Sequence, residues 1–345
     1  MEKNQFSIMI KEVFELLQLK KVPGKTPIEE YLKYKDAEKL YQQIRENINL
    51  YRLRDTNIEK IQEILGDFET IYNCLSNEES KEIFKKMFKF RLAWIVSSDI
   101  TYSNTIAECS NKTRFTYAKE GISCFYNKSK RKYEIGNYLI DTTPYEFSET
   151  WIYKNYFYFA CCPKEGQTVI DIGGYYGESA IWFADLVGEK GHVFTFEMNS
   201  NNIKKLNNNL AINHMQKYID ICEYALWDKK EIIYFFDEGP ETGIDITQGD
   251  NSMQAIQLDD WNEQKKLDEI DYIKIDVEGS EMNVLKGARK VIERYKPNFA
   301  ICVYHNFWDI YNIIKYLKEI VPEYKIYLNQ KVPFPMDTVL FATIC

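Results

Sequence analysis

The second half of the chain alternates between short apolar runs and longer segments in which apolar residues recur at helical spacing. The short runs, rich in β-branched residues, are typical of buried parallel strands and lie at residues 167–172, 192–197, 218–226, 272–276 and 298–303. Helical spacing predicts helices at residues 178–186, 202–212, 280–294 and 307–319. Strands that alternate with helices predict a parallel sheet with helices on both faces.

The last two predicted strands break this alternation. Residues 324–328 and 338–344 are joined by a short loop that contains proline and no helix. Without a crossover helix the pair must be antiparallel. Shorter strands at 232–236 and 255–258 flank an insertion rich in Gly and Asp. The fold class is therefore α/β, with a mostly parallel sheet in which one strand runs against the others.

The N-terminal third has helical patterns and no catalytic motif. Apolar residues recur at helical spacing from Phe6 to Leu17, Pro23-Gly24 ends this segment, and a second helical stretch covers about residues 26–63. Ser76-Asn-Glu-Glu79 has the pattern of a capping box, which predicts that a third helix begins there. These helices are expected to form a lid, an oligomer interface or a partner-binding domain.

These patterns divide the chain into three parts. We expect a helical N-terminal domain (1–110), a connecting or lid region (111–164) and an α/β domain (165–345). The connecting region is weakly patterned, with a strand or hairpin predicted at Tyr133–Ile140. If the chain forms homo-oligomers, the N-terminal helices are the expected interface.

Composition and charge exclude several classes of protein. The chain has 345 residues, and 45% of them are hydrophobic, but no uncharged apolar run of about 18 residues occurs that would predict a membrane span. Charged residues within the first 20 positions interrupt any secretory segment, so we expect a cytoplasmic protein. The net charge of −8 argues against an extended nucleic-acid surface.

The eight cysteines do not indicate a metal site or a disulfide framework. No pair has CxxC spacing, and several lie within apolar strands. We interpret them as reduced, mostly buried thiols.

The first stretch with candidate chemistry is the glycine turn after the strand at 167–172. Asp171 precedes Gly173, Gly174 and Gly177, which gives the pattern D-x-G-G-x-x-G. A carboxylate at this place repels a pyrophosphate and suits a ligand with an ammonium group. Glu197 ends the next strand, where an acidic residue accepts both ribose hydroxyls of a nucleoside. A cationic amino acid joined to a ribose describes S-adenosylmethionine. The alternatives are a nicotinamide-dependent oxidoreductase, or Asp171 as a helix cap.

The second stretch gathers carboxylates at a strand end. Strand alternation puts Lys274 and Asp276 on one face, and Glu278 and Glu281 follow within the next turn. Neighbouring carboxylates are costly unless they face a ligand, a cation or water, and Lys274 could neutralise one of them. Helix capping by Glu278 and Glu281 is the alternative interpretation.

Together these two stretches resemble the FkbM family of S-adenosylmethionine-dependent methyltransferases. The resemblance rests on residues 169–179 with Phe196-Glu197, and on residues 271–288 around Lys-Ile-Asp-Val-Glu-Gly-Ser-Glu, and it covers about residues 165–344. It implies a seven-stranded Rossmann-like sheet with an antiparallel last strand. It also implies O-methylation, often of sugars in surface polysaccharides or of natural products, and hence a small-molecule or glycan acceptor.

The resemblance also implies which residues surround the cofactor. Asp171, Gly173 and Gly177 would hold the methionine part, Glu197 the ribose, and residues 225–228 would lie near the adenine. The full set comprises Asp171, Gly173, Gly174, Tyr176, Gly177, Ser179, Glu197, Met198, Asn199, Asn202, Ala225, Leu226, Trp227 and Asp276. A His-rich turn that many relatives have near Asn329-Gln330 is absent here.

Methyl transfer needs an aligned acceptor hydroxyl and a base that removes its proton. His305 follows the strand at 298–303 at the edge where the site is expected, and its ordinary pKa of about 6.5 suits a base. Asp276 and Glu278 are the competing candidates. Alternatively, these three residues could bind Mg²⁺ or Mn²⁺, although we do not predict a metal. A non-enzymatic binding protein is the remaining class, but inert scaffolds do not need carboxylates at four strand ends.

Overall fold

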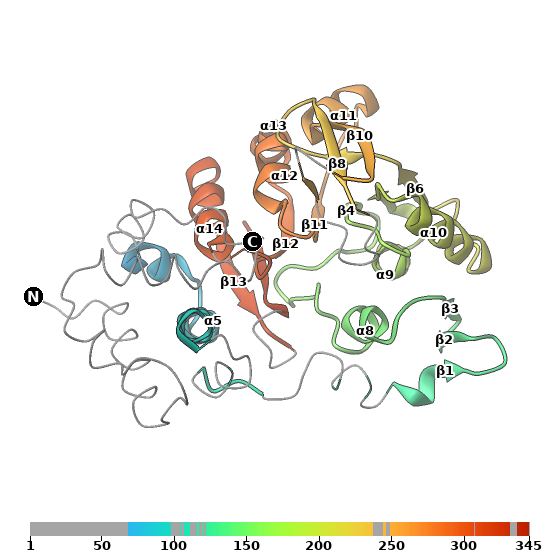
Figure 1. Ribbon diagram of the computed structural model, residues 1–345. Helices are drawn as coiled ribbons and strands as arrows, with labels where there is room; N and C mark the ends of the chain where they lie inside the picture. The colour runs from blue at the N-terminus through green and yellow to red at the C-terminus, as the bar shows by residue number, and fades with distance from the viewer. Residues whose placement is uncertain are drawn as a thin grey trace, which may run out of the picture.

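A computed structural model describes residues 68–97, 104, 107–110, 116, 119, 122–236, 244–245, 249–306, 308–331 and 337–344 (Figure 1). The helices expected before residue 68 lie outside these residues, and so do residues 111–115, which follow the boundary expected at residue 110. No helix among the described residues is long and apolar enough to cross a membrane.

A seven-stranded sheet forms the centre of the molecule, in the order β13-β14-β12-β11-β4-β5-β6 (Figure 1). Its strands are β4 (Thr168–Ile172), β5 (His192–Phe196), β6 (Ile219–Cys222), β11 (Tyr272–Ile275), β12 (Asn298–Cys302), β13 (Lys325–Asn329) and β14 (Val339–Thr343). Neighbouring strands are parallel from β12 through β11, β4 and β5 to β6. Strand β14 is antiparallel to both of its neighbours, β12 and β13. This confirms the predicted fold class and the single reversed strand.

The helices between these strands agree with the sequence pattern, with two differences. They are α9 (Glu178–Val187), α10 (Ser200–Ile212), α11 (Leu258–Lys265), α12 (Glu281–Gly287), α13 (Arg289–Tyr295) and α14 (Asp309–Ile320). The sequence pattern missed α11. The single helix predicted at 280–294 is divided at Ala288, where the backbone leaves the helical region (φ −109°, ψ 10°). Gly287, the last residue of α12, lies so close to another segment that an added Cβ would be 2.0 Å from the carbonyl oxygen of Trp227.

The strand predicted at 218–226 is also divided. Glu223 and Tyr224 form an exposed turn after β6, and the chain then enters β7 (Ala225–Leu226) in another sheet. This four-stranded sheet has the order β7-β10-β8-β9, with β8 (Ile232–Phe235), β9 (Ile244–Asp245) and β10 (Asn251–Ile256). The strands on the two sides of the insertion rich in Gly and Asp, β8 and β10, thus belong to this second sheet.

The segment before β4 forms a small antiparallel sheet and two short helical turns. The strands are β1 (Tyr126–Asn127), β2 (Lys132–Ile135) and β3 (Tyr138–Ile140), preceded by η2 (Ser123–Phe125), and the helical turns are α8 (Pro144–Phe147) and the π-helical η3 (Ser148–Ile152). This confirms the hairpin expected at Tyr133–Ile140. The side chains of Asn209 in α10 and of Asn213, directly after α10, hydrogen-bond the backbone of Asp141 and Leu139, which fixes this sheet against the α/β core.

Helix α5 (Glu78–Ser97) lies against the edge strand β13 (Figure 1). The helix begins one residue later than the predicted capping box implies, because Asn77 rather than Ser76 is the residue before it and accepts from the N–H of Ser80. The hydroxyl of Ser76 instead accepts from the N–H of Ile326, and that of Ser80 accepts from the N–H of Leu328. Residues 68–88 also share one hydrophobic core with the central sheet.

Ser80→Ala tests the attachment of α5 to the sheet. The hydroxyl of Ser80 is fully buried, and without it the N–H of Leu328 has lost its partner, so we expect about 1–3 kcal/mol less free energy of unfolding. Urea denaturation followed by circular dichroism measures the difference. Ser252→Ala, at an exposed position on β10, should change stability by less than about 0.5 kcal/mol. Equal effects of the two substitutions would contradict the attachment.

Candidate active site

The turn after β4 is built for close approach of backbone to backbone. Gly173 has φ +87°, and a Cβ there would lie 1.9 Å from the carbonyl oxygen of Asp276 at the end of β11. The N–H groups of Gly173 and Gly174 both donate to the carbonyl of Phe196, at 3.0 and 2.9 Å. The N–H of Tyr175 donates to the carboxylate of Glu197 at 2.8 Å. The glycines therefore bind the turn to the neighbouring strands.

Asp171 is fully buried beneath this turn and has its own partners. Its carboxylate accepts hydrogen bonds from the hydroxyls of Ser179 (2.9 Å) and Thr195 (3.1 Å). The ammonium of Lys274 lies 3.4 Å away and donates to the carbonyl of Gly173 at 2.7 Å. Lys274, which we expected to neutralise a carboxylate of the second stretch, thus forms its ion pair with Asp171. Burial alone would lower the pKa of Lys274, but Asp171 and Asp276 raise it above its ordinary value.

Glu197 lies at the carboxyl end of β5 with its carboxylate held by the backbone. One oxygen accepts from the N–H groups of Met198 (2.9 Å) and Asn199 (2.8 Å), and the other accepts from Tyr175. Burial raises the pKa of Glu197, and these hydrogen bonds oppose that rise. The side chain is therefore fixed in one orientation at the rim of a cleft.

The cleft lies over the carboxyl ends of β4, β5 and β11 and contains many of the expected residues. Those that line it are Gly173, Ser179, Glu197, Met198, Asn202, Ala225, Leu226, Asp276 and Glu278. Asp171, Gly174, Tyr176, Gly177, Asn199, Trp227 and His305 are not among its lining residues. Trp227 packs beside Ile233 and Ala255 and donates to Glu231, and Asn199 caps α10. The expected set thus divides into a lining group and a group that supports it.

A tyrosine connects the cleft to a buried carboxylate. The hydroxyl of Tyr156 lies 2.8 Å from Oδ2 of Asp276 and 3.2 Å from Oε2 of Glu149, which is 2% exposed. Burial, with the charges of Asp276 and Glu149, raises the pKa of Tyr156 well above its ordinary value. Tyr156 therefore keeps its proton and is a hydrogen-bond donor to these carboxylates.

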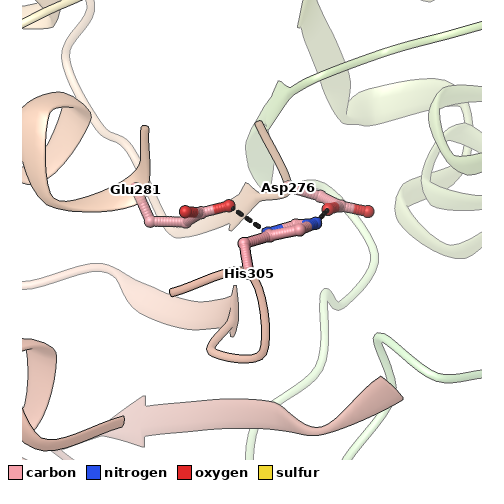
Figure 2. A group of neighbouring side chains, drawn as sticks. All are labelled: Asp276, Glu281 and His305. Atoms are coloured by element: carbon pink, nitrogen blue, oxygen red, sulfur yellow. Dashed lines mark hydrogen bonds and ion pairs between the residues drawn. The ribbon is translucent and has the colours of Figure 1, made fainter. Parts of the chain in front are cut away.

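His305 lies among three carboxylates. Figure 2 shows its imidazole between Glu281 and Asp276. Nδ1 is 2.7 Å from Oε1 of Glu281, whereas Nε2 is 3.7 Å from Oδ1 of Asp276 and 3.5 Å from Oε1 of Glu278. Burial alone would lower the pKa of His305, but Glu281 and Glu278 raise it well above the ordinary value that suits a base.

Arg91 of α5 supports the loop that carries His305. Its guanidinium donates at 2.9 Å to the carbonyls of both Val303 and Asn306, and the side chain is buried. Burial lowers the pKa of Arg91 to about 10, and the nearby carboxylate of Asp309 opposes this, so the group stays charged. A helix far away in the sequence therefore holds the backbone on both sides of His305.

Sequence reasoning missed several members of the site. Arg91 and Tyr304 were not among the expected site residues, and their positions depend on contacts between distant parts of the chain. Glu178, the first residue of α9, also lines the cleft, and its place directly after the glycine turn is a signal that could have found it.

A comparison with protein families identifies the domain around this cleft. A family model described as "Methyltransferase FkbM domain" matches residues 171–324, which include the strand ends and loops described above. The chain therefore carries an FkbM methyltransferase domain. Among functionally curated proteins, none matches the chain.

Solved structures share the fold at low sequence identity. A crystal structure of a methyltransferase FkbM from Methylobacillus flagellatus has a TM-score of 0.53 and 19% identity, and the match covers 83% of this chain and 60% of that one. A putative rRNA methylase from Clostridium thermocellum has 15% identity and a TM-score of 0.37, with 59% and 96% of the two chains covered. Fibrillarin from Aeropyrum pernix, in complex with bound S-adenosylmethionine, has 14% identity and a TM-score of 0.34, with 52% and 67% covered. Of these three structures, only the first has a TM-score high enough to support the fold.

Arg91→Met tests the support of the His305 loop. Two hydrogen bonds from a charged donor are lost and two carbonyls lose a partner, so we expect about 3 kcal/mol less free energy of unfolding in urea. Arg91→Lys, which keeps one donor group, should lie between the variant and the wild type. Lys85→Met, which removes an exposed ion pair with Glu82, should cost less than about 1 kcal/mol. If Arg91→Met were as stable as the wild type, Arg91 would not support the His305 loop.

Glu178→Gln tests the electrostatics of the cleft wall. Burial raises the pKa of Glu178 from its ordinary value of 4.5 to about 7. The folded protein therefore holds a proton that the unfolded chain releases, and stability falls as the pH rises from about 5 to about 7. Because glutamine does not ionise, the variant should lose this slope and become more stable than the wild type at pH 8. If stability changed with pH in the same way in both proteins, the raised pKa of Glu178 would be contradicted.

Proposed function

We propose that this chain, through its FkbM methyltransferase domain, is an S-adenosylmethionine-dependent O-methyltransferase that acts on a hydroxyl of a sugar, a surface glycan or a related metabolite. The proposal rests on one observation: the carboxylate residue Glu197 and a group of apolar residues line the same cleft. Glu197 offers a fixed carboxylate for a ribose diol, and Met198, Ala225 and Leu226 line the wall beside it. An apolar slot beside a diol acceptor suits an adenosine.

The glycine turn favours this cofactor over a nicotinamide dinucleotide. A dinucleotide needs backbone N–H groups that face its pyrophosphate. In this turn the N–H groups of Gly173 and Gly174 donate to Phe196, and that of Tyr175 donates to Glu197. These groups are therefore not available to a phosphate. The charge of Asp171 does not by itself exclude a pyrophosphate, because Lys274 compensates it.

The other end of the cleft suits a polyhydroxyl acceptor. Glu146, Thr150, Tyr156, Tyr304 and Glu278 line it, and they offer hydroxyl groups and carboxylate oxygens with few apolar groups. The carboxylates disfavour a phosphorylated acceptor, and the tyrosine rings can pack against a sugar.

The reaction has two requirements at this end of the cleft. The acceptor oxygen must lie in line with the methyl group and its sulfonium, and the hydroxyl proton must leave. Asp276 and Glu278 are among the residues that line the cleft, whereas His305 is not, and its Nδ1 is held by Glu281. We therefore assign contact with the acceptor hydroxyl to Asp276 and Glu278.

The cysteines support a cytoplasmic location as part of the proposal. Seven of the eight lie in the described residues and form no disulfide there. Free thiols of this number are typical of a reducing compartment.

Binding of S-adenosylhomocysteine, measured by isothermal titration calorimetry, tests the cofactor. The wild type should bind it, and Glu197→Gln should bind about tenfold to hundredfold more weakly, because hydrogen bonds from the ribose to a charged acceptor contribute about 1.5–3 kcal/mol. NADH should not bind.

Glu263→Gln is the matched control, since Glu263 is an exposed carboxylate in an ion pair with Lys290. It should bind like the wild type, and circular dichroism should show that both variants are folded. Absence of S-adenosylhomocysteine binding at millimolar concentration, or tight binding of NADH, would overturn the proposal.

A further inference from the structure

We propose that Asp276, Glu278 and Nε2 of His305 bind a divalent metal cation of the first transition row, and that Glu281 orients His305 for this task. The site lies immediately below the acceptor end of the cleft. It goes beyond the proposed function, because neither the cofactor nor a methyl acceptor is needed for a cation to bind there.

The first argument is the position of Nε2. The side chain of His305 is 7% exposed, and Nε2 makes no hydrogen bond within the described part of the chain. Two carboxylate oxygens face it at 3.5 and 3.7 Å, from Glu278 and Asp276. An imidazolium N–H would close to about 2.8 Å on such an oxygen, as Nδ1 has done with Glu281. Separations slightly above about 3 Å are instead those between ligands that share a cation at about 2.1 Å.

The second argument is the partner of Nδ1. A histidine that binds a metal almost always donates its other ring N–H to a carboxylate or a carbonyl, which fixes the ring and its tautomer. Here Nδ1 donates to Oε1 of Glu281, a fully buried residue. The same oxygen accepts from the N–H groups of Val277 (3.2 Å) and Gly279 (3.4 Å). Ligand atoms of Asp276, Glu281 and His305 lie within 4.8 Å of one another, so Glu281 is near enough to serve as a ligand itself. Its commitment to Nδ1 makes it the orienting group instead, and Glu278, 3.5 Å from Nε2, takes the third ligand position.

The loops that carry the ligands are held before any cation binds. Glu278 and Gly279 both have positive φ, +53° and +96°, which turns the chain sharply after Asp276. The side-chain amide of Asn306 donates to the carbonyl of Gly279 at 2.8 Å, and Arg91 holds the carbonyls on both sides of His305. Glu278 has a side chain that is 27% exposed, so it can adjust its position to a cation.

The donor set indicates the class of cation. Carboxylate oxygens suit Mg²⁺ and Mn²⁺, whereas an imidazole nitrogen favours transition metals. A set of two carboxylates and one imidazole, open toward the cleft, fits Mn²⁺ or a similar ion with further positions for water or an acceptor hydroxyl. A hydroxyl bound to such an ion loses its proton more easily.

Titration of the full chain with Mn²⁺ tests the site, after treatment with a chelator. The loss of the electron paramagnetic resonance signal of free Mn²⁺ measures binding, and neither cofactor nor acceptor is present. We expect a single high-affinity Mn²⁺ per chain. His305→Gln and Glu278→Gln should abolish this binding. Glu281→Gln should weaken it about tenfold to hundredfold, as expected for an outer group that orients a ligand.

His214→Asn and Glu263→Gln, both at exposed positions, are the matched controls and should bind Mn²⁺ like the wild type. Circular dichroism and S-adenosylhomocysteine binding identify any variant that fails to fold, and they also separate this proposal from the cofactor assignment. Absence of stoichiometric Mn²⁺ binding by the wild type, or wild-type affinity in folded His305→Gln and Glu278→Gln, would overturn the site.

Discussion

The arrangement of the cleft depends on the buried ion pair between Lys274 and Asp171. The two residues are register partners on adjacent parallel strands, β11 and β4, and both are almost fully buried. A buried charge of either kind alone would be costly, so each requires the other. Lys274 also donates to the carbonyl of Gly173, and thereby joins the ion pair to the glycine turn. The turn can then lie against the backbone of Asp276, where only a residue without a side chain fits. Loss of either charge would therefore disturb the turn as well as the sheet.

The cleft is completed by segments that lie far from it in the sequence. Tyr156 comes from the region before the sheet, and Arg91 comes from α5, which is bound to the edge strand β13. Arg91 reaches across to the backbone beside His305, so the described part of the N-terminal region has a structural role in the site. A helix that only covered the sheet edge would not need a buried guanidinium. We infer that α5 and the FkbM domain form one structural unit.

The sequence predicted the order of strands and helices in the α/β half, because each element has its own apolar period. It could not predict where the chain leaves one sheet for another, as it does between β6 and β7, since both strands are apolar and only their partners differ. The residues at strand ends were found by the same logic, because parallel strands bring their carboxyl ends to one edge. The ion pair of Asp171 could not be predicted, since its partner Lys274 is distant in sequence and adjacent only in the sheet. The role of Arg91 could not be predicted, because it rests on hydrogen bonds to two carbonyl groups that any sequence provides.

The electrostatics of the cleft connect the two proposals. Of the described residues that line it, five are acidic (Glu146, Glu178, Glu197, Asp276 and Glu278), and the basic one, Lys274, is already compensated by Asp171. Such a field attracts a sulfonium and an ammonium group, which suits the proposed methyl donor. The same field opposes negative charge on an acceptor oxygen, because carboxylates nearby raise the free energy of an alkoxide. A cation held by Asp276, Glu278 and His305 would offset this effect where the proton leaves, because its two positive charges balance the two carboxylates. The negative field around Glu197 would stay in place for the cofactor.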